Sequence, residues 1–322
     1  MFLSLVLVAT ASAACPRTPS FRDGDGDVVI LAQNLKFIAT GGQRDARATI
    51  LANYLKSEGA AVDLLLLSEA RDADTIEEHV GEWCFYSQAG NGLDGYRWDP
   101  AGSAGRSPGG LVLGVRQRSE GLQRGIAGSA GRVYRARPVS LAEGLLGPLV
   151  GFVKGWAGLD IDGTRIVWTH TQASYDAHPE RGAGNAAKGR AGQFHDLAGD
   201  LGRSSQPTLV TGDLNVLDDT PVPKARIAAG IDGKTLADFV ASTGIHFAPP
   251  RAACADGTFV GTLAPDGRGG KLAGAALDRV GVNDAFNARH PGMTVGCADI
   301  SSPKLRLSDH RGLLIDVPFD KR

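Results

Sequence analysis

Short runs of apolar residues recur along the chain at the length of a β-strand, for example at 28–32, 62–67, 166–168 and 209–210. They are rich in Val, Leu and Ile, a composition typical of strands that are buried on both faces. Each of these runs leads into a polar side chain, namely Asn34, Glu69, His170 and Asp213. Because open α/β sheets build their sites where strand ends meet, the pattern predicts that these side chains share one edge.

The rest of the pattern predicts a mixed α/β domain. Further strands are expected at 110–115, 152–161, 279–282 and 313–317. Helices are predicted at 44–58 and 185–201, where apolar residues fall on one helical face and a glycine follows that can end the helix. The segment 86–110 is rich in Gly, Ser and Asp, and we expect it to form a long surface loop at the rim of a cleft.

At 322 residues and 43% hydrophobic content, the chain is long enough to bury a large core. No linker, charge block or repeat divides it, so we expect one domain over 27–322. Nothing requires a partner protein, and a monomer is expected. The formal net charge is −1, with 34 basic and 35 acidic residues, so no global basic field indicates a nucleic-acid partner.

The first 14 residues are apolar and end in small residues, which predicts a signal peptide cleaved near 13–15. This segment is too short to span a bilayer, and the alternative is an N-terminal strand or core helix. The residues at 15–26 are expected to form a flexible mature N-terminus. The protein is therefore predicted to be secreted or periplasmic, without a transmembrane segment.

The four cysteines are widely scattered and lack the paired spacing of a metal site. Export favours disulfides, and the most plausible pair is Cys254 with Cys297, because both lie in the loop-rich C-terminal third. The partner of Cys84 is left open. Cys15 lies at the expected cleavage region, and an alternative role for it is the lipidated first residue of a lipoprotein.

Two polar clusters in the second half of the chain could carry chemistry. A glycine before Asp213 lets the backbone turn, so Asp213 and Asn215 can aim oxygen-bearing side chains out of a strand end. Near the C-terminus, Asp309 and His310 precede an apolar strand. An Asp278 carboxylate that points at His310 would fix its tautomer and raise its basicity, as in general-base catalysis. Taken alone, each cluster is also compatible with an ordinary turn.

The order of these pieces resembles the endonuclease/exonuclease/phosphatase superfamily. The matching residues are Asn34, Glu69, Thr169 with His170, Gly212 with Asp213 and Asn215, Asp278, and Ser308 with Asp309 and His310. The resemblance extends over 27–319 and implies the DNase I-like fold, a four-layer α/β (α+β) sandwich of two mixed sheets packed face to face with helices outside. Residues 169–173, Thr-His-Thr-Gln-Ala, are most similar to the bacterial neutral sphingomyelinases.

This resemblance implies a role for each site residue. Glu69 would bind a divalent metal, with Asn34 beside it and Asp309 binding directly or through water. Oxygen ligands suit Mg²⁺, and Mn²⁺ is a possible substitute. In the implied reaction His310, held by Asp278, activates the attacking water. His170 would hydrogen-bond the phosphate or assist the leaving group, while Asp213 and Asn215 position the water and stabilise the transition state.

The resulting hypothesis is an exported phosphodiesterase that cleaves a phospholipid or sphingolipid headgroup. A nuclease on the same scaffold is the main alternative, because candidate loops hold Arg97, Arg106, Arg116 and Arg118. A catalytically inactive binding module is less favoured, since every expected polar position is filled. The segment 279–307 contains Phe286 but no Trp or Tyr, so transient membrane contact through an aromatic hairpin is not expected there.

Overall fold

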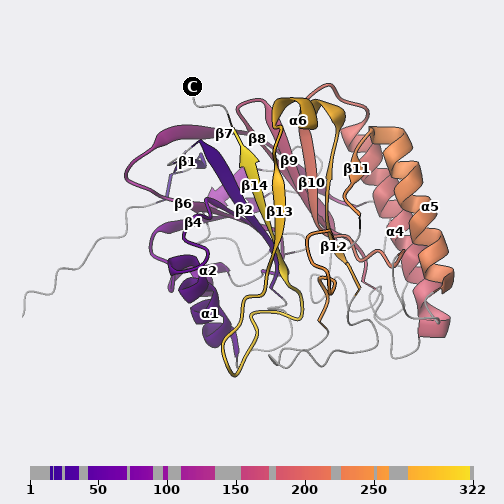
Figure 1. Cartoon of the computed structure of the whole chain (residues 1–322), viewed down its shortest axis with the longest axis horizontal. Helices are drawn as coiled ribbons and strands as arrows, with labels where there is room; N and C mark the ends of the chain where they lie inside the picture. The colour runs from indigo at the N-terminus through magenta and orange to yellow at the C-terminus, as the bar shows by residue number, and fades with distance from the viewer. Residues whose placement is uncertain are drawn as a thin grey trace, which may run out of the picture.

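The described strands of the computed structural model form two seven-stranded sheets that pack face to face (Figure 1). The structure describes residues 15–16, 18–23, 26–35, 43–70, 73–89, 97–100, 110–134, 154–173, 179–218, 226–249, 252–260 and 275–319. The first sheet has the order β1 (Ser20–Asp23), β7 (Leu122–Val133), β8 (Gly155–Ile161), β9 (Thr164–His170), β10 (Thr208–Asp213), β12 (Asp278–Val282) and β11 (His246–Phe247). The second has the order β13 (Thr294–Ala298), β14 (Gly312–Pro318), β2 (Asp27–Asn34), β3 (Leu64–Ser68), β6 (Val112–Arg116), β4 (Trp83–Ala89) and β5 (Arg97–Pro100).

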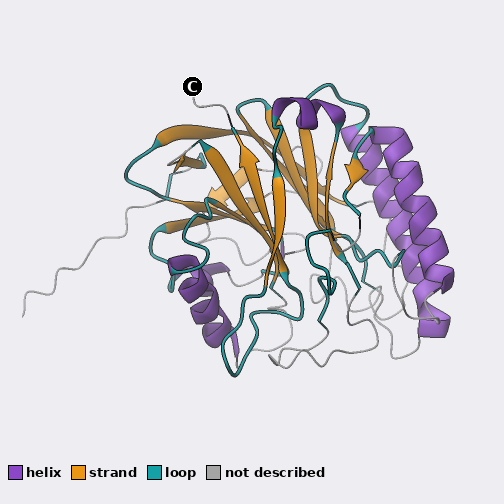
Figure 2. Cartoon of the chain, viewed as in Figure 1, coloured by secondary structure: helices purple, strands orange, loops and turns teal. Residues whose placement is uncertain are grey.

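Helices cover the outer faces of both sheets, which gives four layers (Figure 2). Helix α1 (Arg44–Lys56) and the short α2 (Ala73–Glu77) lie on the second sheet, while α4 (Pro179–Leu201) and α5 (Arg226–Thr243) lie on the first. A further short helix, α6 (Asp284–Arg289), follows β12. This arrangement confirms the expected two-sheet sandwich with helices outside.

Three apolar layers hold the sandwich together. Between the sheets, Ile30 and Ile315 of one sheet pack in the same cluster as Leu159 and Trp168 of the other. Outside the first sheet, Phe194 of α4 packs with strand residues, and the α1 leucines do the same outside the second sheet. Each wholly buried side chain of this size contributes about 1.5–3 kcal/mol relative to an exposed one. The apolar strand runs are therefore buried on both faces, as the sequence predicts.

Strand direction brings the polar strand ends to one edge. The pairs β2 with β3 and β9 with β10 are each parallel, so their C-terminal residues lie side by side. Strand β12 is antiparallel to β10, and β14 is antiparallel to β2, so these two strands begin where the others end. The segments that carry Asn34, Glu69, His170, Asp213 and Asp278 therefore meet at a common edge of the sandwich.

Both predicted helices are confirmed, whereas the long helix α5 and the short helices α2 and α6 were not predicted. Helix α1 matches its expected range, and α4 begins at Pro179, six residues earlier than the expected start at 185. Helix α5 has a weak local signal, because it contains Gly230 and Gly233, which have poor helix propensity. It is stabilised instead by packing against α4, where the rings of Phe194 and Phe239 meet edge to face at 5.4 Å.

The prediction of a flexible segment at 15–26 is wrong. Ser20–Asp23 forms β1, which pairs with β7, and Asp23 makes a buried ion pair with Arg124 at 2.7 Å. Cys15 is joined to Cys84 by a disulfide, so its sulfur is not available for lipidation, and the lipoprotein alternative is also corrected. The expected disulfide between Cys254 and Cys297 is confirmed. The expected signal peptide at 1–14 lies outside the described residues.

No helix within the described part of the chain is long and apolar enough to cross a bilayer.

Gly212 is required where β9 and β10 approach each other. Its φ is +121°, and a Cβ at this position would lie 2.2 Å from the carbonyl oxygen of Thr169. We therefore expect Gly212→Ala to destabilise the fold by about 3 kcal/mol or more, because both strand ends must shift and the backbone is strained. Urea unfolding followed by circular dichroism measures the change.

Gly230→Ala is the matched control for this prediction. Gly230 lies in α5 with no atom within 4 Å of an added Cβ, so alanine there should stabilise the protein by about 0.5–1 kcal/mol. Equal effects of the two substitutions would contradict the assigned role of Gly212.

Candidate active site

Polar side chains from both sheets meet at the seam between them. Asn34, at the end of β2, donates from Nδ2 to Oδ2 of Asp213, at the end of β10, over 2.8 Å. The Nε2 atom of His170 lies 3.5 Å from Oε1 of Glu69 and 3.5 Å from Oδ2 of Asp213. All four side chains are buried. The structure thus brings together the four strand-end residues that the sequence pattern singled out.

The backbone at two of these strand ends is in the left-handed region. Glu69 has φ 53° and Asn215 has φ 52°, a conformation that non-glycine residues seldom adopt. Next to Glu69, the amide of Ala70 donates to the carbonyl of Gly110 over 2.9 Å, and Gly110 itself has φ +63°. The close approach of these two chain segments fixes the turn that directs the Glu69 carboxylate.

His310 and Asp278 form a hydrogen-bonded dyad beside this cluster. Nδ1 of His310 lies 2.8 Å from Oδ2 of Asp278, and its other ring nitrogen, Nε2, lies 3.7 Å from Oδ2 of Asp213. Burial alone would lower the pKa of His310, but the charges of Asp278 and Asp213 raise it to about 10. The pairing expected from sequence is present, and it leaves Nε2 as the nitrogen directed toward the cluster.

The pKa of Asp213 is raised to about 7, chiefly by burial. The negative charge of Asp278 adds to this increase, while His310, Lys154 and the hydrogen bond from Asn34 oppose it. Burial therefore disfavours the charged form of Asp213, and the nearby positive groups favour it.

Lys154 is a site residue that the sequence analysis did not include. Its Nζ atom lies 3.1 Å from Nδ1 and 2.5 Å from Nε2 of His170, and 3.8 Å from Oε1 of Glu69. The side chain is buried, which is rare for a lysine unless it is paired, and here its charged partner is Glu69. The sequence does contain an indication of this role. Lys154 directly precedes an apolar strand, and a charged ammonium group there does not contribute to apolar packing.

Asn215 joins the ends of β9 and β10. Its Nδ2 donates to the carbonyl of Thr171 over 3.1 Å, and its amide N–H donates to Oδ1 of Asp213 over 3.1 Å. The amide of Thr171 in turn donates to the Asp213 carbonyl over 3.0 Å. The side-chain NH₂ of Asn215 thus holds the site together, and the predicted contact of Asn215 with water or the transition state stays a prediction.

Comparison with known proteins identifies the family. The model of the Endonuclease/Exonuclease/phosphatase family matches residues 31–310, most of the chain. The chain belongs to this family. The match spans every predicted site residue from Asn34 to His310. A search of curated protein sequences found no match.

Solved structures with a similar fold include proteins that act on different substrates. Sphingomyelinase C from Streptomyces griseocarneus is 17% identical and has a TM-score of 0.58, with 90% of this chain and 99% of that one covered. Beta toxin from Staphylococcus aureus is 15% identical, with a TM-score of 0.57 and coverage of 89% and 99%. TDP2 from D. rerio, solved with a single-strand DNA product, is 13% identical, with a TM-score of 0.56 and coverage of 91% and 99%. At these identities the likeness shows the fold of this Endonuclease/Exonuclease/phosphatase family member and not its substrate.

The seam of this family member offers oxygen donors that fit a hard divalent cation. Buried carboxylates of Glu69, Asp213 and Asp278 and the amide of Asn34 lie there, while all four cysteines are in disulfides. Among the described residues, ligand atoms of Asp213, Asp278 and His310 also lie within 4.8 Å of one another. The hydrogen bond between His310 and Asp278 engages two of those atoms, so we interpret this group as an acid–base unit.

Asp309, the third predicted metal ligand, is buried next to His310. The Ser308 hydroxyl lies 3.4 Å from its Oδ1 atom. Burial lowers the pKa of Arg47, on α1, and the charge of Asp309 partly offsets that decrease. Asp309 therefore belongs to the same polar neighbourhood, and its binding to a metal stays a prediction.

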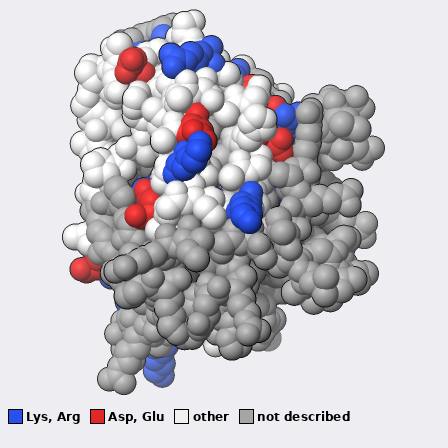
Figure 3. Space-filling model, turned by 90° about the vertical axis from the view of Figure 1, so that its right-hand side faces the viewer, with Lys and Arg blue, Asp and Glu red and all other residues white. Residues whose placement is uncertain are grey.

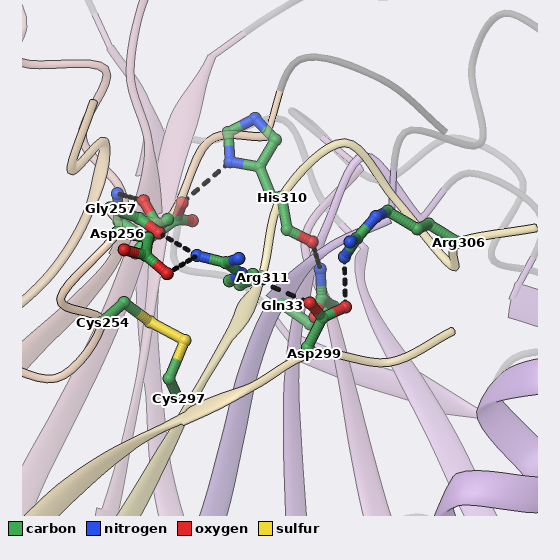
Figure 4. The surroundings of a disulfide bond; sticks show 11 residues. Gln33, Cys254, Asp256, Gly257, Cys297, Asp299, Arg306, His310 and Arg311 are labelled. Atoms are coloured by element: carbon green, nitrogen blue, oxygen red, sulfur yellow. Dashed lines mark hydrogen bonds and ion pairs between the residues drawn. A yellow bond between two sulfur atoms is a disulfide. The ribbon is translucent and has the colours of Figure 1, made fainter. Parts of the chain in front are cut away.

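A disulfide-anchored segment, residues 252–260, supports the dyad from outside. The amide of Asp278 donates to the Thr258 hydroxyl over 3.0 Å, and the ring of Phe259 meets that of His310 edge to face at 5.1 Å. The disulfide from Cys254 to Cys297 ties this segment to β13. In Figure 4, Arg311 lies between Gly257 and Asp299, close to the disulfide, with His310 above it; Arg311 Nη1 donates to the Gly257 carbonyl over 3.0 Å. Both members of the dyad are therefore held by the same segment.

We expect Asp278→Asn to lower the pKa of His310 by about 1 to 3 pH units, because the ring loses its nearest negative charge. The change keeps the side-chain volume, and NMR titration of the His310 ring measures the pKa. Asp299→Asn is the control, since Asp299 is half-exposed and pairs with Arg306 instead. An unchanged His310 pKa in Asp278→Asn would contradict the dyad.

Proposed function

We propose that this protein is an exported, divalent-metal-dependent phosphodiesterase that hydrolyses its substrate by in-line attack of water. The observation that carries the proposal is the junction at the seam, where the His310–Asp278 dyad faces Asp213. Beside it, Glu69 from the second sheet lies within 4 Å of His170 and Lys154 from the first. A base, a buried cation and metal-type oxygen donors are the groups that phosphodiester hydrolysis requires. The two disulfides support an extracellular or periplasmic location.

Each protein group has a part in the proposed reaction. His310 takes the proton of the attacking water on Nε2, because Nδ1 is occupied by Asp278. Asp213, fixed by Asn34, accepts a hydrogen bond from the same water and so aligns it. On the other side, Lys154 and His170 lie together and donate hydrogen bonds to the phosphoryl oxygens and the leaving oxygen. These donors stabilise charge that grows in the transition state.

Glu69 and Asn34 would hold the metal, with Asp309 as the further ligand that the family resemblance implies. Mg²⁺ is our first candidate and Mn²⁺ the second, because the donors are oxygens. When bound, such an ion would polarise a phosphoryl oxygen, neutralise the buried carboxylates and bring the pKa of His310 closer to neutral pH.

We propose a phospholipid or sphingolipid headgroup as the substrate. Support comes from residues 169–173, which resemble the sphingomyelinase sequence, and from the similarity of the fold to sphingomyelinase C. Phe286, the one aromatic residue at 279–307, is wholly buried, and among the described residues only Leu122 is a large hydrophobic side chain that is exposed. The described surface therefore offers no aromatic membrane anchor.

A nuclease is the second candidate, favoured by the similarity of the fold to TDP2 solved with a DNA product. Two of the arginines that suggested it lie elsewhere. Arg116 pairs with Glu82 at 2.7 Å and Arg118 with Asp63 at 3.1 Å, at the end of β6 opposite to the site. Arg97 and Arg106 fall outside the side chains that the structure describes. On the α4 and α5 face, the described basic and acidic side chains are interspersed and form no basic patch there (Figure 3).

We expect Glu69→Gln and His310→Gln each to lower the turnover of a chromogenic phosphodiester by about 10²- to 10⁴-fold, since each removes one catalytic group. EDTA should abolish activity, and added Mg²⁺ should restore it. The matched controls are Glu82→Gln and His195→Gln, which change exposed residues outside the site and should keep full activity. Unchanged turnover in both site variants would contradict the proposed function.

Substrate choice is tested by comparing sphingomyelin vesicles, plasmid DNA and bis(p-nitrophenyl) phosphate, each with and without EDTA. We expect release of phosphocholine from the vesicles to be the fastest reaction. A faster cleavage of plasmid, with a rate that falls steeply as salt increases, would instead identify a nuclease.

A further inference from the structure

A fully buried ion pair connects the two helices that cover the first sheet. Arg190 of α4 contacts Asp232 of α5 through two bonds, Nε to Oδ1 at 3.0 Å and Nη2 to Oδ2 at 2.7 Å. Both side chains have an exposed fraction of 0%. This two-pronged geometry fixes the orientation of the guanidinium as well as its position.

The same two side chains also hold the chain just beyond β9 and β10. Nη1 of Arg190 donates to the carbonyl of Gln172 over 3.0 Å, and the amide of Gln172 donates to the side chain of Gln193, also on α4, over 2.8 Å. The amide of Leu217 donates to Oδ2 of Asp232 over 2.9 Å. Side chains of α4 and α5 therefore hold the backbone of the loops that follow β9 and β10.

These loops carry the catalytic residues of the proposed reaction. Gln172 lies two residues after His170, and Leu217 lies two residues after Asn215. The loops are joined to each other at Thr171, which donates from its amide to the Asp213 carbonyl and from its hydroxyl to the Leu214 carbonyl. Hydrogen bonds and the short covalent segments between them thus connect the buried ion pair to Asp213, and to the backbone two residues after His170.

Stability alone does not account for such a pair. Removing two charges from water offsets most of their attraction, and apolar residues of similar volume often stabilise a protein equally well. The second buried pair of this kind, Arg124 with Asp23, has bonds of 2.8 and 2.7 Å. It lies toward the other end of the first sheet, where Arg124 also pairs with Asp162 in the turn between β8 and β9. It therefore provides a comparison of the same chemistry away from the site.

We propose that Arg190 and Asp232 are positioning residues, which set the separation of His170 and Asp213 by holding the loops 171–173 and 214–217. The expected effect on catalysis rests on the proposed hydrolytic function. The claim that Arg190 and Asp232 hold the two loops in place does not depend on that function.

The first test compares Arg190→Lys with Arg124→Lys. Lysine keeps the charge but cannot make the three bonds of Arg190. We expect kcat to fall by about 10- to 100-fold in Arg190→Lys, because a displacement of about 1 Å is enough for such a loss, with KM changed less than about threefold. Arg124→Lys should keep the kcat of the unmodified protein. Equal kcat values in both variants would overturn the proposal.

A double variant separates positioning from stability. Arg190→Leu with Asp232→Leu removes both charges and leaves no unpaired buried ion, so the protein should still fold. Its midpoint of unfolding should be lower, because two backbone groups, the Gln172 carbonyl and the Leu217 amide, each lose a partner. We expect its kcat to remain at least tenfold lower even so. Full activity in this folded variant would show that the pair serves stability alone.

Hydrogen exchange gives a readout that needs no substrate. In Arg190→Lys the amides of 171–173 and 214–217 should exchange at least tenfold faster, whereas Arg124→Lys should leave both segments unchanged. Unaltered exchange in these loops would overturn the positional role even in an active enzyme. If the unmodified protein hydrolyses no phosphodiester while the exchange result holds, the proposed function fails and the positional role stands.

Discussion

The hydrogen bond from Asn34 to Asp213 crosses the seam between the two sheets. The geometry of the site depends on how the two sheets pack against each other at this point. Glu69 comes from one sheet, while His170, Asp213 and Asp278 come from the other. A second bond crosses close by, from Nε1 of Trp168 to the carbonyl of Leu67 over 3.3 Å. Neither sheet contains the site by itself. Small movements of one sheet against the other would therefore move Glu69 away from His170, and would move His310, which precedes β14, away from Asp278.

The packing of the two sheets also determines the electrostatics of the site. Packing the sheets buries several carboxylates together, which raises the pKa of Asp213 and makes His310 a stronger base. Lys154 and Arg47 are buried cationic side chains of this neighbourhood, and the pKa of His310 is raised by its carboxylate neighbours. Because charged carboxylates are costly to bury, their grouping at this edge is a physical reason to expect a bound cation.

The sequence predicted most of the fold because the signals are local. Buried strands read as apolar runs, and their order with Asn34, Glu69 and His170 was enough to infer a shared edge. Asp278 was inferred as the partner of His310 from the residue types alone, and the structure shows the hydrogen bond between the two side chains. Long-range contacts were harder: nothing near Cys15 in the chain indicates Cys84, and nothing near Lys154 indicates that its ammonium reaches His170. Helix α5 was missed because tertiary packing, and not propensity, stabilises it.

The left-handed backbone at Glu69 and Asn215 has a consequence for how such sequences can change. A glycine at either position would relieve a strain of about 1 kcal/mol or more at Glu69 and less at Asn215, since Asn tolerates this region well. The relief would remove the functional side chain at the same time. Selection for stability and selection for chemistry therefore pull in opposite directions at these two positions. Relatives that keep only the scaffold would be expected to drift to glycine here first, so these two sites distinguish enzymes from inactive descendants.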